Sequence, residues 1–154
     1  DYKSFGPNVS KPDWDSAKSI QEMPVTSAIT SIRNSHLSRE LGEEKAKALQ
    51  VEGYAYSGGG HEIVRVDVST DGGLTWDQAE LLDDKTMGSK AWCWKRWRYA
   101  LGDRKAEKTT LMVKATDEAY NTQPQSYASI YNARGNLATA WHRVEIESPE
   151  KATV

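Results

Sequence analysis

Cysteine is almost absent from this chain of 154 residues, since Cys93 is the only one. A single thiol cannot form an internal disulfide and supplies no pair of thiolates for a structural zinc site. The histidines, His36, His61 and His142, are far apart and have no acidic or thiol partner at metal-ligand spacing. The sequence therefore predicts a domain that is stabilised by packing and binds no metal.

Long hydrophobic runs and an excess of one charge sign are also lacking. No apolar run approaches the ~20 residues that span a bilayer, and the N-terminal residues lack the pattern of a signal peptide. The chain has 20 Lys and Arg residues against 22 Asp and Glu residues, a formal net charge of -2. No overall field therefore attracts nucleic acid or an anionic membrane. We expect a soluble chain with neither as a partner, although a small anion can still bind locally.

Motifs of several enzyme classes are missing as well. The chain has no Gly-x-Ser-x-Gly elbow and no Ser or Cys beside a base in a recognisable frame, so hydrolase chemistry has no support. Ser57-Gly58-Gly59-Gly60 runs into a predicted strand rather than a helix, which favours a turn over a phosphate-binding loop. Residues 117–124 lack the ligand spacing of an EF-hand, so a hydrogen-bonded turn is favoured over a calcium loop.

From Val25 onward, the chain consists of short runs rich in Val, Ile, Thr, Trp and Tyr between turn residues. This pattern is typical of an all-β antiparallel sandwich. A chain of 154 residues is long enough for one such domain with its own core. We predict strands near 25–32, 47–57, 62–70, 75–81, 91–101, 109–117 and 141–147.

Residues 62–70 show the alternation of a strand with one buried and one solvated face, with only Ile63 out of step. Asp71-Gly72-Gly73 supplies the positive φ angles that a tight hairpin needs. We therefore expect this strand to pair antiparallel with 75–81. The valines on the expected buried face are Val64, Val66 and Val68, and the polar residues on the expected solvated face are Arg65, Asp67 and Ser69.

Two segments lack a strand pattern. Residues 1–24, with their spaced prolines, are predicted to be a linker packed along a surface. Residues 33–47 have helical composition and are either a helix or a solvated charged loop. We accordingly expect the domain to span 25–148, with a C-terminal tail at 149–154.

The predicted strand at 91–101 is unusual because both of its faces carry large apolar groups. Trp92 and Trp94 lie on one face, and Cys93 and Trp97 lie on the other. A second apolar face indicates either burial against another domain or subunit, or a central strand covered by loops. The first alternative makes Trp92, Trp94 and Trp97 interface residues. Cys93 is expected to be a small buried hydrophobe.

Arg134 is the strongest candidate for a binding residue. It lies in the loop at 131–136, directly before Gly135 and ahead of the strand predicted at 141–147. The fork of donors on an arginine suits a tetrahedral oxyanion better than the point charge of a lysine. The other arginines are expected to be solvated surface charges: Arg65, Arg96, Arg98 and Arg143.

Several short motifs occur at 53–60, 65–69, 71–76, 114–117, 121–124, 131–136 and 141–144. In their order and spacing, these motifs closely resemble the C-terminal dimerisation domain of the sulfite oxidase family. The resemblance runs from Asp1 to about Glu147. It implies an immunoglobulin-like (E-set type) sandwich that forms a homodimer and follows a molybdopterin-binding catalytic domain. In animal members a cytochrome b5-type haem domain precedes both.

The resemblance also implies a role for Arg134, which occupies the position of the family's loop arginine in the oxyanion pocket above the molybdenum. Tyr131 and Ala133 stand where the family usually has Trp and Leu, so the loop has less apolar anchoring. The related nitrate reductases typically lack this arginine, although Trp92-Cys93-Trp94 is similar to their sequence. The molybdenum-molybdopterin, and the haem where present, are expected in upstream domains, with no cofactor and no catalytic residue in this chain.

We therefore interpret the chain as the dimerisation domain of an enzyme that oxidises sulfite to sulfate. Its expected partners are a second copy, the upstream molybdopterin domain, and the sulfite or sulfate anion through Arg134. By resemblance, the expected compartment is the mitochondrial intermembrane space. The alternative is a stand-alone immunoglobulin-like interaction or scaffold module without enzymatic activity. A β-sandwich that binds carbohydrate or cell surfaces fits the fold class alone and has no site to support it.

Overall fold

The structure of the chain is a computed structural model that describes residues 2–34, 49–82, 90–101 and 109–146. Eight strands and a short 3-10 helix are found in this part of the chain. They are β1 (Thr26–Asn34), β2 (Leu49–Tyr56), β3 (Ile63–Ser69), β4 (Asp77–Gln78), β5 (Glu80–Leu81), β6 (Lys95–Leu101), β7 (Thr109–Asp117), η3 (Tyr127–Ser129) and β8 (His142–Ile146).

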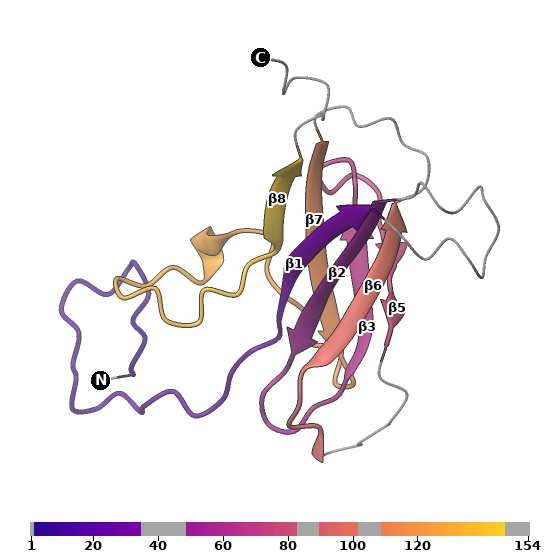
Figure 1. Cartoon of the computed structure of the whole chain (residues 1–154). Coiled ribbons are helices and arrows are strands. Elements are labelled where there is room, and N and C mark those ends of the chain that lie inside the picture. The colour runs from indigo at the N-terminus through magenta and orange to yellow at the C-terminus, as the bar shows by residue number, and fades with distance from the viewer. Residues whose placement is uncertain (1, 35–48, 83–89, 102–108, 147–154) are drawn as a thin grey trace.

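The strands form two four-stranded antiparallel sheets that lie face to face (Figure 1). One sheet has the order β1-β2-β6-β5, and the other has the order β4-β3-β7-β8. The predicted immunoglobulin-like antiparallel sandwich is confirmed. The strands expected near 25–32, 109–117 and 141–147 correspond to β1, β7 and β8 within a few residues.

The core lies between the two sheets and is built around Trp97 of β6, which is fully buried. Trp97 is paired with Gly53 of β2. A Cβ atom on Gly53 would overlap both the Trp97 ring and the carbonyl oxygen of Ala28, so only glycine allows this approach. The side chains that pack around this centre are aliphatic: Val51, Ala55, Val66, Val68, Leu111, Val113 and Ala115.

Strand β3 departs from the predicted alternation because a bulge lies between Ile63 and Arg65. The bulge turns Ile63 into the core and leaves Val64 46% exposed, so the expectation of a buried Val64 is wrong. Asp67 and Ser69, expected on a solvated face, are also buried. Each has a polar partner, since Arg65 Nε donates to Asp67 at 2.7 Å and the Ser69 hydroxyl donates to Asp71 at 2.8 Å.

The hairpin after β3 is confirmed, but the single strand expected at 75–81 is wrong. Gly72 and Gly73 adopt φ angles of 76° and 95°, and β4 pairs antiparallel with β3. Beyond the hairpin, β5 pairs with β6 in the opposite sheet. Ala79 lies at the crossing and donates its N–H to the carbonyl of Val66 at 2.9 Å. The segment therefore switches between the sheets.

The prediction of a strand at 91–101 is also wrong for residues 91–94. Strand β6 begins only at Lys95, and residues 91–94 form no strand. Within β6 the alternation is regular, with Trp97 and Leu101 buried and Arg96 exposed. The strand therefore has one apolar face rather than two.

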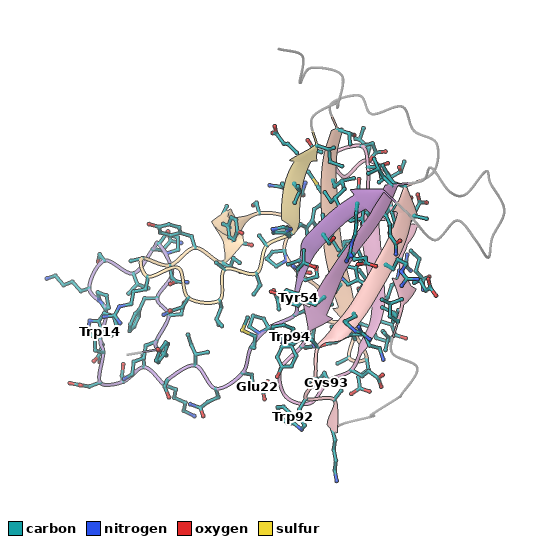
Figure 2. The ribbon with its side chains drawn as sticks, viewed as in Figure 1. Trp14, Glu22, Tyr54, Trp92, Cys93 and Trp94 are labelled. Carbon is teal, nitrogen blue, oxygen red and sulfur yellow. The ribbon has the colours of Figure 1, made fainter. Side chains whose placement is uncertain are left out.

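The tryptophans before β6 form an exposed aromatic patch, which we define as Trp92, Trp94 and Tyr54 (Figure 2). Trp92 and Trp94 are 63% and 64% exposed, and Trp94 stacks on Tyr54 with the ring centroids 4.6 Å apart. Cys93 lies between them and is exposed, so the expected buried thiol is wrong. Trp97 is fully buried in its own sandwich and has no surface to offer a partner.

The segments outside the sandwich differ in how far the structure describes them. Residues 2–24 contain no helix or strand, and most of them lie beside the long loop between β7 and β8, away from the sheets (Figure 1). The segment returns to the sandwich at Met23, whose carbonyl accepts from Gly58 N at 2.7 Å. Most of the segment at 33–47 and all of the tail at 149–154 lie outside the described residues. The division of the chain at residue 24 stays a prediction.

Candidate functional site

The loop that carries Arg134 leaves the sandwich through a turn organised by Asp117, the last residue of β7. Asp117 is fully buried and accepts hydrogen bonds from Ser57 Oγ at 2.8 Å, Ala119 N at 3.0 Å and Asn121 N at 2.9 Å. Burial acts to raise the pKa of Asp117, but the hydrogen bonds from Asn121 and Ser57 outweigh it and hold the pKa below its usual value. The hydrogen-bonded turn predicted here is confirmed.

The buried side chain of Gln123 joins the base of the loop to both sheets. Its Oε1 accepts from Ser27 Oγ at 2.6 Å and from Ala115 N at 3.0 Å. Its Nε2 donates to the carbonyl of Thr139 at 3.0 Å, which holds the returning end of the loop. Both ends of the loop are therefore tied to the sandwich by interactions that are shielded from water.

The tip of the loop is a five-residue turn closed by Asn132. The Asn132 Nδ2 donates to the carbonyl of Asn136 at 2.7 Å, and Asn136 N donates back to Asn132 Oδ1 at 3.0 Å. Gly135 adopts a φ of 66°, which favours glycine, and donates its N–H to the carbonyl of Asn132 at 3.0 Å. Arg134 is exposed at this tip, so its placement in a glycine-flanked loop is confirmed.

The N-terminal segment packs against this tip, a packing partner that the sequence did not indicate. Arg134 Cζ lies 5.4 Å from the centroid of the Trp14 ring. Lys3 Nζ donates to the carbonyl of Trp14, and Asn136 Nδ2 donates to the carbonyl of Lys3 at 3.4 Å. Phe5 contacts Trp14 edge-on, with the ring centroids 4.8 Å apart.

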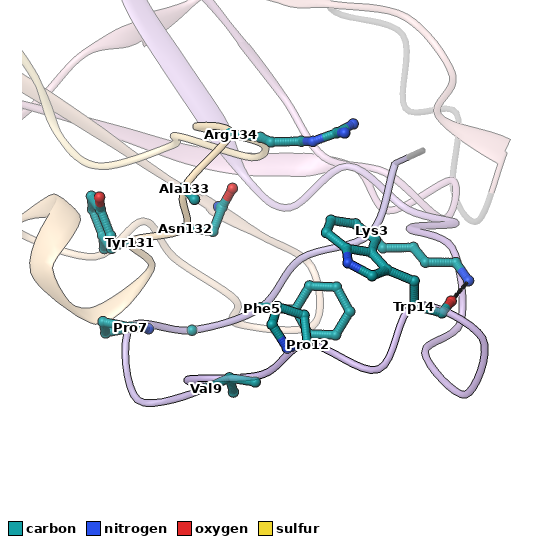
Figure 3. A pocket seen from close by; sticks show the side chains of 11 residues that line it. Lys3, Phe5, Pro7, Val9, Pro12, Trp14, Tyr131, Asn132, Ala133 and Arg134 are labelled. Carbon is teal, nitrogen blue, oxygen red and sulfur yellow. Dashed lines mark hydrogen bonds between the residues drawn. The ribbon is translucent and has the colours of Figure 1, made fainter.

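A cavity of about 220 Å³ lies between the N-terminal segment and the loop tip (Figure 3). Among the described residues, its lining includes two cationic side chains, Lys3 and Arg134, and no acidic one. The rest of the lining is apolar or neutral, which suits a small anion held by local charge. These neutral residues are Phe5, Gly6, Pro7, Val9, Pro12, Trp14, Tyr131, Asn132 and Ala133.

The other arginines that the structure describes lie on the sandwich surface and not beside Arg134. Arg143 donates to the carbonyl of Gln125 at 2.9 Å. Arg98 Nε lies 3.5 Å from a Glu52 carboxylate oxygen, and Arg65 is paired with Asp67. Arg65, Arg96 and Arg143 are exposed, as expected of surface charges, and Arg98 is half-buried.

The histidines that the structure describes are also spread over the molecule. His142 Nδ1 accepts from the backbone N–H of Ile29 at 3.2 Å, and His61 Nδ1 lies 3.7 Å from a Glu118 carboxylate oxygen. Among the described residues, no three His, Cys, Asp or Glu side chains converge as metal ligands. No helix in the same part of the chain is long and apolar enough to cross a membrane.

The chain belongs to the Mo-co oxidoreductase dimerisation domain family, whose sequence profile matches residues 17–149. It is 47% identical over 148 residues to sulfite oxidase of Gallus gallus and 46% identical over 149 residues to mitochondrial sulfite oxidase of Homo sapiens. These matches cover 93% and 95% of this chain. The resemblance to the sulfite oxidase family is confirmed.

Two more proteins are similar to this chain, one in sequence and one in fold. The chain is 38% identical over 131 residues to an NADH nitrate reductase of Spinacia oleracea, a match that covers 82% of this chain. The sulfane dehydrogenase SoxCD of Paracoccus pantotrophus has a similar fold, with a TM-score of 0.65 at 24% identity over 95% of this chain. The chain spans only 30% of the chicken sulfite oxidase, 26% of the human one, 14% of the nitrate reductase and 34% of the SoxCD chain.

Proposed function

We propose that this chain is the dimer-forming part of an enzyme that oxidises sulfite to sulfate, and that Arg134 contacts the substrate oxyanion. The observation that carries the proposal is the construction of the Arg134 loop. An exposed arginine stands on a turn that Asn132 closes and Gln123 ties to the sandwich. The names of the relatives that are 46% and 47% identical support sulfite as the substrate.

Arginine is well suited to this contact because its guanidinium offers parallel N–H donors to two oxygens of one anion. The Asn132 turn and the buried Gln123 reduce the freedom of the backbone beneath it. A donor held in place loses less entropy when the anion binds. The positive lining of the adjacent cavity attracts an anion to the same place.

The residues of this chain that the structure describes do not fit a molybdenum cofactor. Cys93 is the only thiol, and it lies in the aromatic patch, remote from the end of the molecule where Trp14 lies (Figure 2). The described histidines and carboxylates do not converge into a ligand set. We therefore place the molybdenum-molybdopterin, and any haem, in domains upstream of residue 1, joined to this domain through residues 1–24.

The second copy of the chain is the proposed partner of the aromatic patch. Trp92 and Trp94 present a large, partly planar apolar surface, of the kind that dimer interfaces bury. Trp97 is not included because its own sandwich encloses it. Mitochondrial sulfite oxidases among the relatives support a mitochondrial location, and within it we propose the intermembrane space.

The substitution Arg134→Met in the complete enzyme tests the substrate contact. We expect it to raise KM for sulfite about ten- to a hundredfold, because a charge-assisted contact to a desolvated anion contributes about 1.5–3 kcal/mol. If Arg134 also binds the oxyanion more strongly in the transition state, kcat falls as well. Arg134→Lys should recover only part of the loss, since a point charge does not reproduce two parallel donors.

The matched control is Arg143→Met, which removes an exposed arginine of β8 that donates to the backbone carbonyl of Gln125. We expect this control to keep the wild-type KM and kcat. Wild-type KM and kcat in Arg134→Met would show that the loop is only a packing element. That result would favour the alternative of an interaction module that takes no part in substrate binding.

A further inference from the structure

We propose that Trp14 is a positioning residue for Arg134, so that the N-terminal segment completes the anion site. The inference rests on the proposed role of Arg134 in binding the oxyanion. The observation behind it is that the Arg134 guanidinium carbon lies 5.4 Å from the Trp14 ring centroid. This distance lies within the ~6 Å range in which an aromatic ring attracts a cation.

Trp14 is itself held in place by the segment that surrounds it. The segment is closed on itself, because Ile20 N donates to the carbonyl of Tyr2 at 2.6 Å. Inside this closed loop, the edge of Phe5 lies against the Trp14 ring, and Lys3 Nζ donates to the Trp14 carbonyl. Figure 3 shows Phe5, Lys3 and Trp14 together on one side of the cavity.

The same segment is attached to the turn that carries Arg134. The link is the hydrogen bond from Asn136 Nδ2 to the carbonyl of Lys3. Asn136 also closes the turn with Asn132. The ring of Trp14 and the backbone of Arg134 are therefore held by one connected set of contacts, and a change at the ring reaches the arginine without passing through the core.

The side chains next to Arg134 in the loop offer little support of their own. Tyr131 is 56% exposed, and Ala133 is an exposed methyl group. Arginine has a long side chain that loses rotamer freedom when it is fixed. A tryptophan has the strongest face of the aromatic residues for a cation. Trp14 therefore restricts the Arg134 side chain in a way that Tyr131 and Ala133 do not.

Contact through the ring face also suits the chemistry of the site. The N–H donors of a guanidinium point outward in its own plane, whereas the attraction to an aromatic ring does not require those donors. Trp14 can hold the cation while the edge of the guanidinium meets an oxyanion. Lys3 lines the same cavity and adds a second positive charge. The resulting site takes a small tetrahedral or pyramidal oxyanion.

The first test measures the contact itself, on the 154-residue chain. In an NMR spectrum, the Nε–H resonance of Arg134 is assigned by its loss in Arg134→Met. We expect the Trp14 ring current to displace this resonance from the usual arginine position, and Trp14→Leu to return it there. A resonance that Trp14→Leu leaves unchanged would overturn the proposal.

The second test is a double-mutant cycle on KM for sulfite and on inhibition by sulfate in the complete enzyme. We expect Trp14→Leu to raise KM and the inhibition constant three- to tenfold, less than Arg134→Met does, and Trp14→Phe to recover part of the loss. In the Arg134→Met background, Trp14→Leu should have no further effect. The control is Tyr127→Leu, which removes another half-exposed aromatic ring, on η3 of the same loop.

The possible outcomes distinguish a failure of the positioning role of Trp14 from a failure of the proposed substrate contact of Arg134. If Arg134→Met leaves both constants unchanged, the proposed function fails, and the role of Trp14 fails with it. If Arg134→Met raises the constants and Trp14→Leu does not, only the role of Trp14 is refuted. Equal effects of Trp14→Leu in both backgrounds would likewise refute it, because the ring would then act independently of the arginine.

Discussion

Gly53 bears the strictest steric requirement of any glycine that the structure describes. Its position on β2 faces the Trp97 ring and lies against the carbonyl oxygen of Ala28, so a single added methyl group has no room. The obstructing oxygen belongs to the backbone of β1 and cannot rotate away. We expect Gly53→Ala to lower the free energy of unfolding by about 3 kcal/mol or more, at the upper end of overpacking costs. Urea unfolding followed by tryptophan fluorescence measures this change.

Gly6→Ala is the control for this substitution, because an added Cβ at Gly6 meets no atom within 4 Å. We expect its stability to stay within about 0.5 kcal/mol of the wild type, as for most surface substitutions. Equal effects at the two positions would show that the packing of Gly53 on Trp97 is looser than the structure indicates.

The local structure around single residues was predictable where it depends on close neighbours in the chain. The loop position of Arg134 was predicted from Gly135 beside it, which marks a turn, and the turn contacts of Asn132 could have been predicted from the preference of asparagine for bonding nearby backbone. Trp14 and Gln123 could not have been found in this way. Their partners lie far along the chain or on another sheet, and no local pattern of residues records such contacts.

At the scale of elements, the sequence predicted most of the segments that form strands, but of the strand pairings it predicted only that of β3 with β4. The bulge after Ile63 exchanges the faces of Ile63 and Val64, because an extra residue reverses the side-chain direction. The segment at 75–81 has a continuous strand composition, yet β4 and β5 take their partners from different sheets. Partner choice is a tertiary property, since it is set by which edge lies within reach.

The contact between β8 and β1 carries a predicted pH dependence. Burial lowers the pKa of His142 below its usual value of 6.5. Its Nδ1 accepts a hydrogen bond from Ile29 N–H, which a protonated Nδ1 cannot do. The unfolded chain therefore binds this proton more readily than the folded one. The contribution to stability is complete above about pH 6.5 and is lost as the pH falls from there through the folded-state pKa.

His142→Asn isolates this effect, because asparagine can accept the same hydrogen bond through its oxygen and does not titrate. Free energies of unfolding are compared for the two proteins between pH 8 and pH 5 in urea. The other titratable groups are common to both proteins, so their contributions cancel in the difference. We expect the wild type to lose stability relative to the variant as the pH falls. Parallel pH profiles would contradict the assignment.

At the scale of the whole molecule, the loop site and the aromatic patch occupy separate regions. The N-terminal segment with Trp14 extends away from the sheets, whereas Trp92, Cys93 and Trp94 lie close to the sandwich (Figure 2). A dimer formed through the patch therefore need not cover the Arg134 loop. Loss of the dimer and loss of anion binding should consequently be separable by mutation.

The aromatic patch is the proposed contact surface between two copies of the chain. We expect the chain to sediment as a homodimer at micromolar concentration, as in obligate dimers, whose interfaces bury about 2,000 Å² or more. Replacing both Trp92 and Trp94 with serine should weaken association at least about thirtyfold, since even one buried interface tryptophan often contributes about 2 kcal/mol or more. Leu74→Ser is the control, because it removes an 84% exposed apolar side chain on the hairpin between β3 and β4. A strict monomer in the wild type would refute self-association of this chain. A double variant that associates as strongly as the wild type would place the interface on another surface.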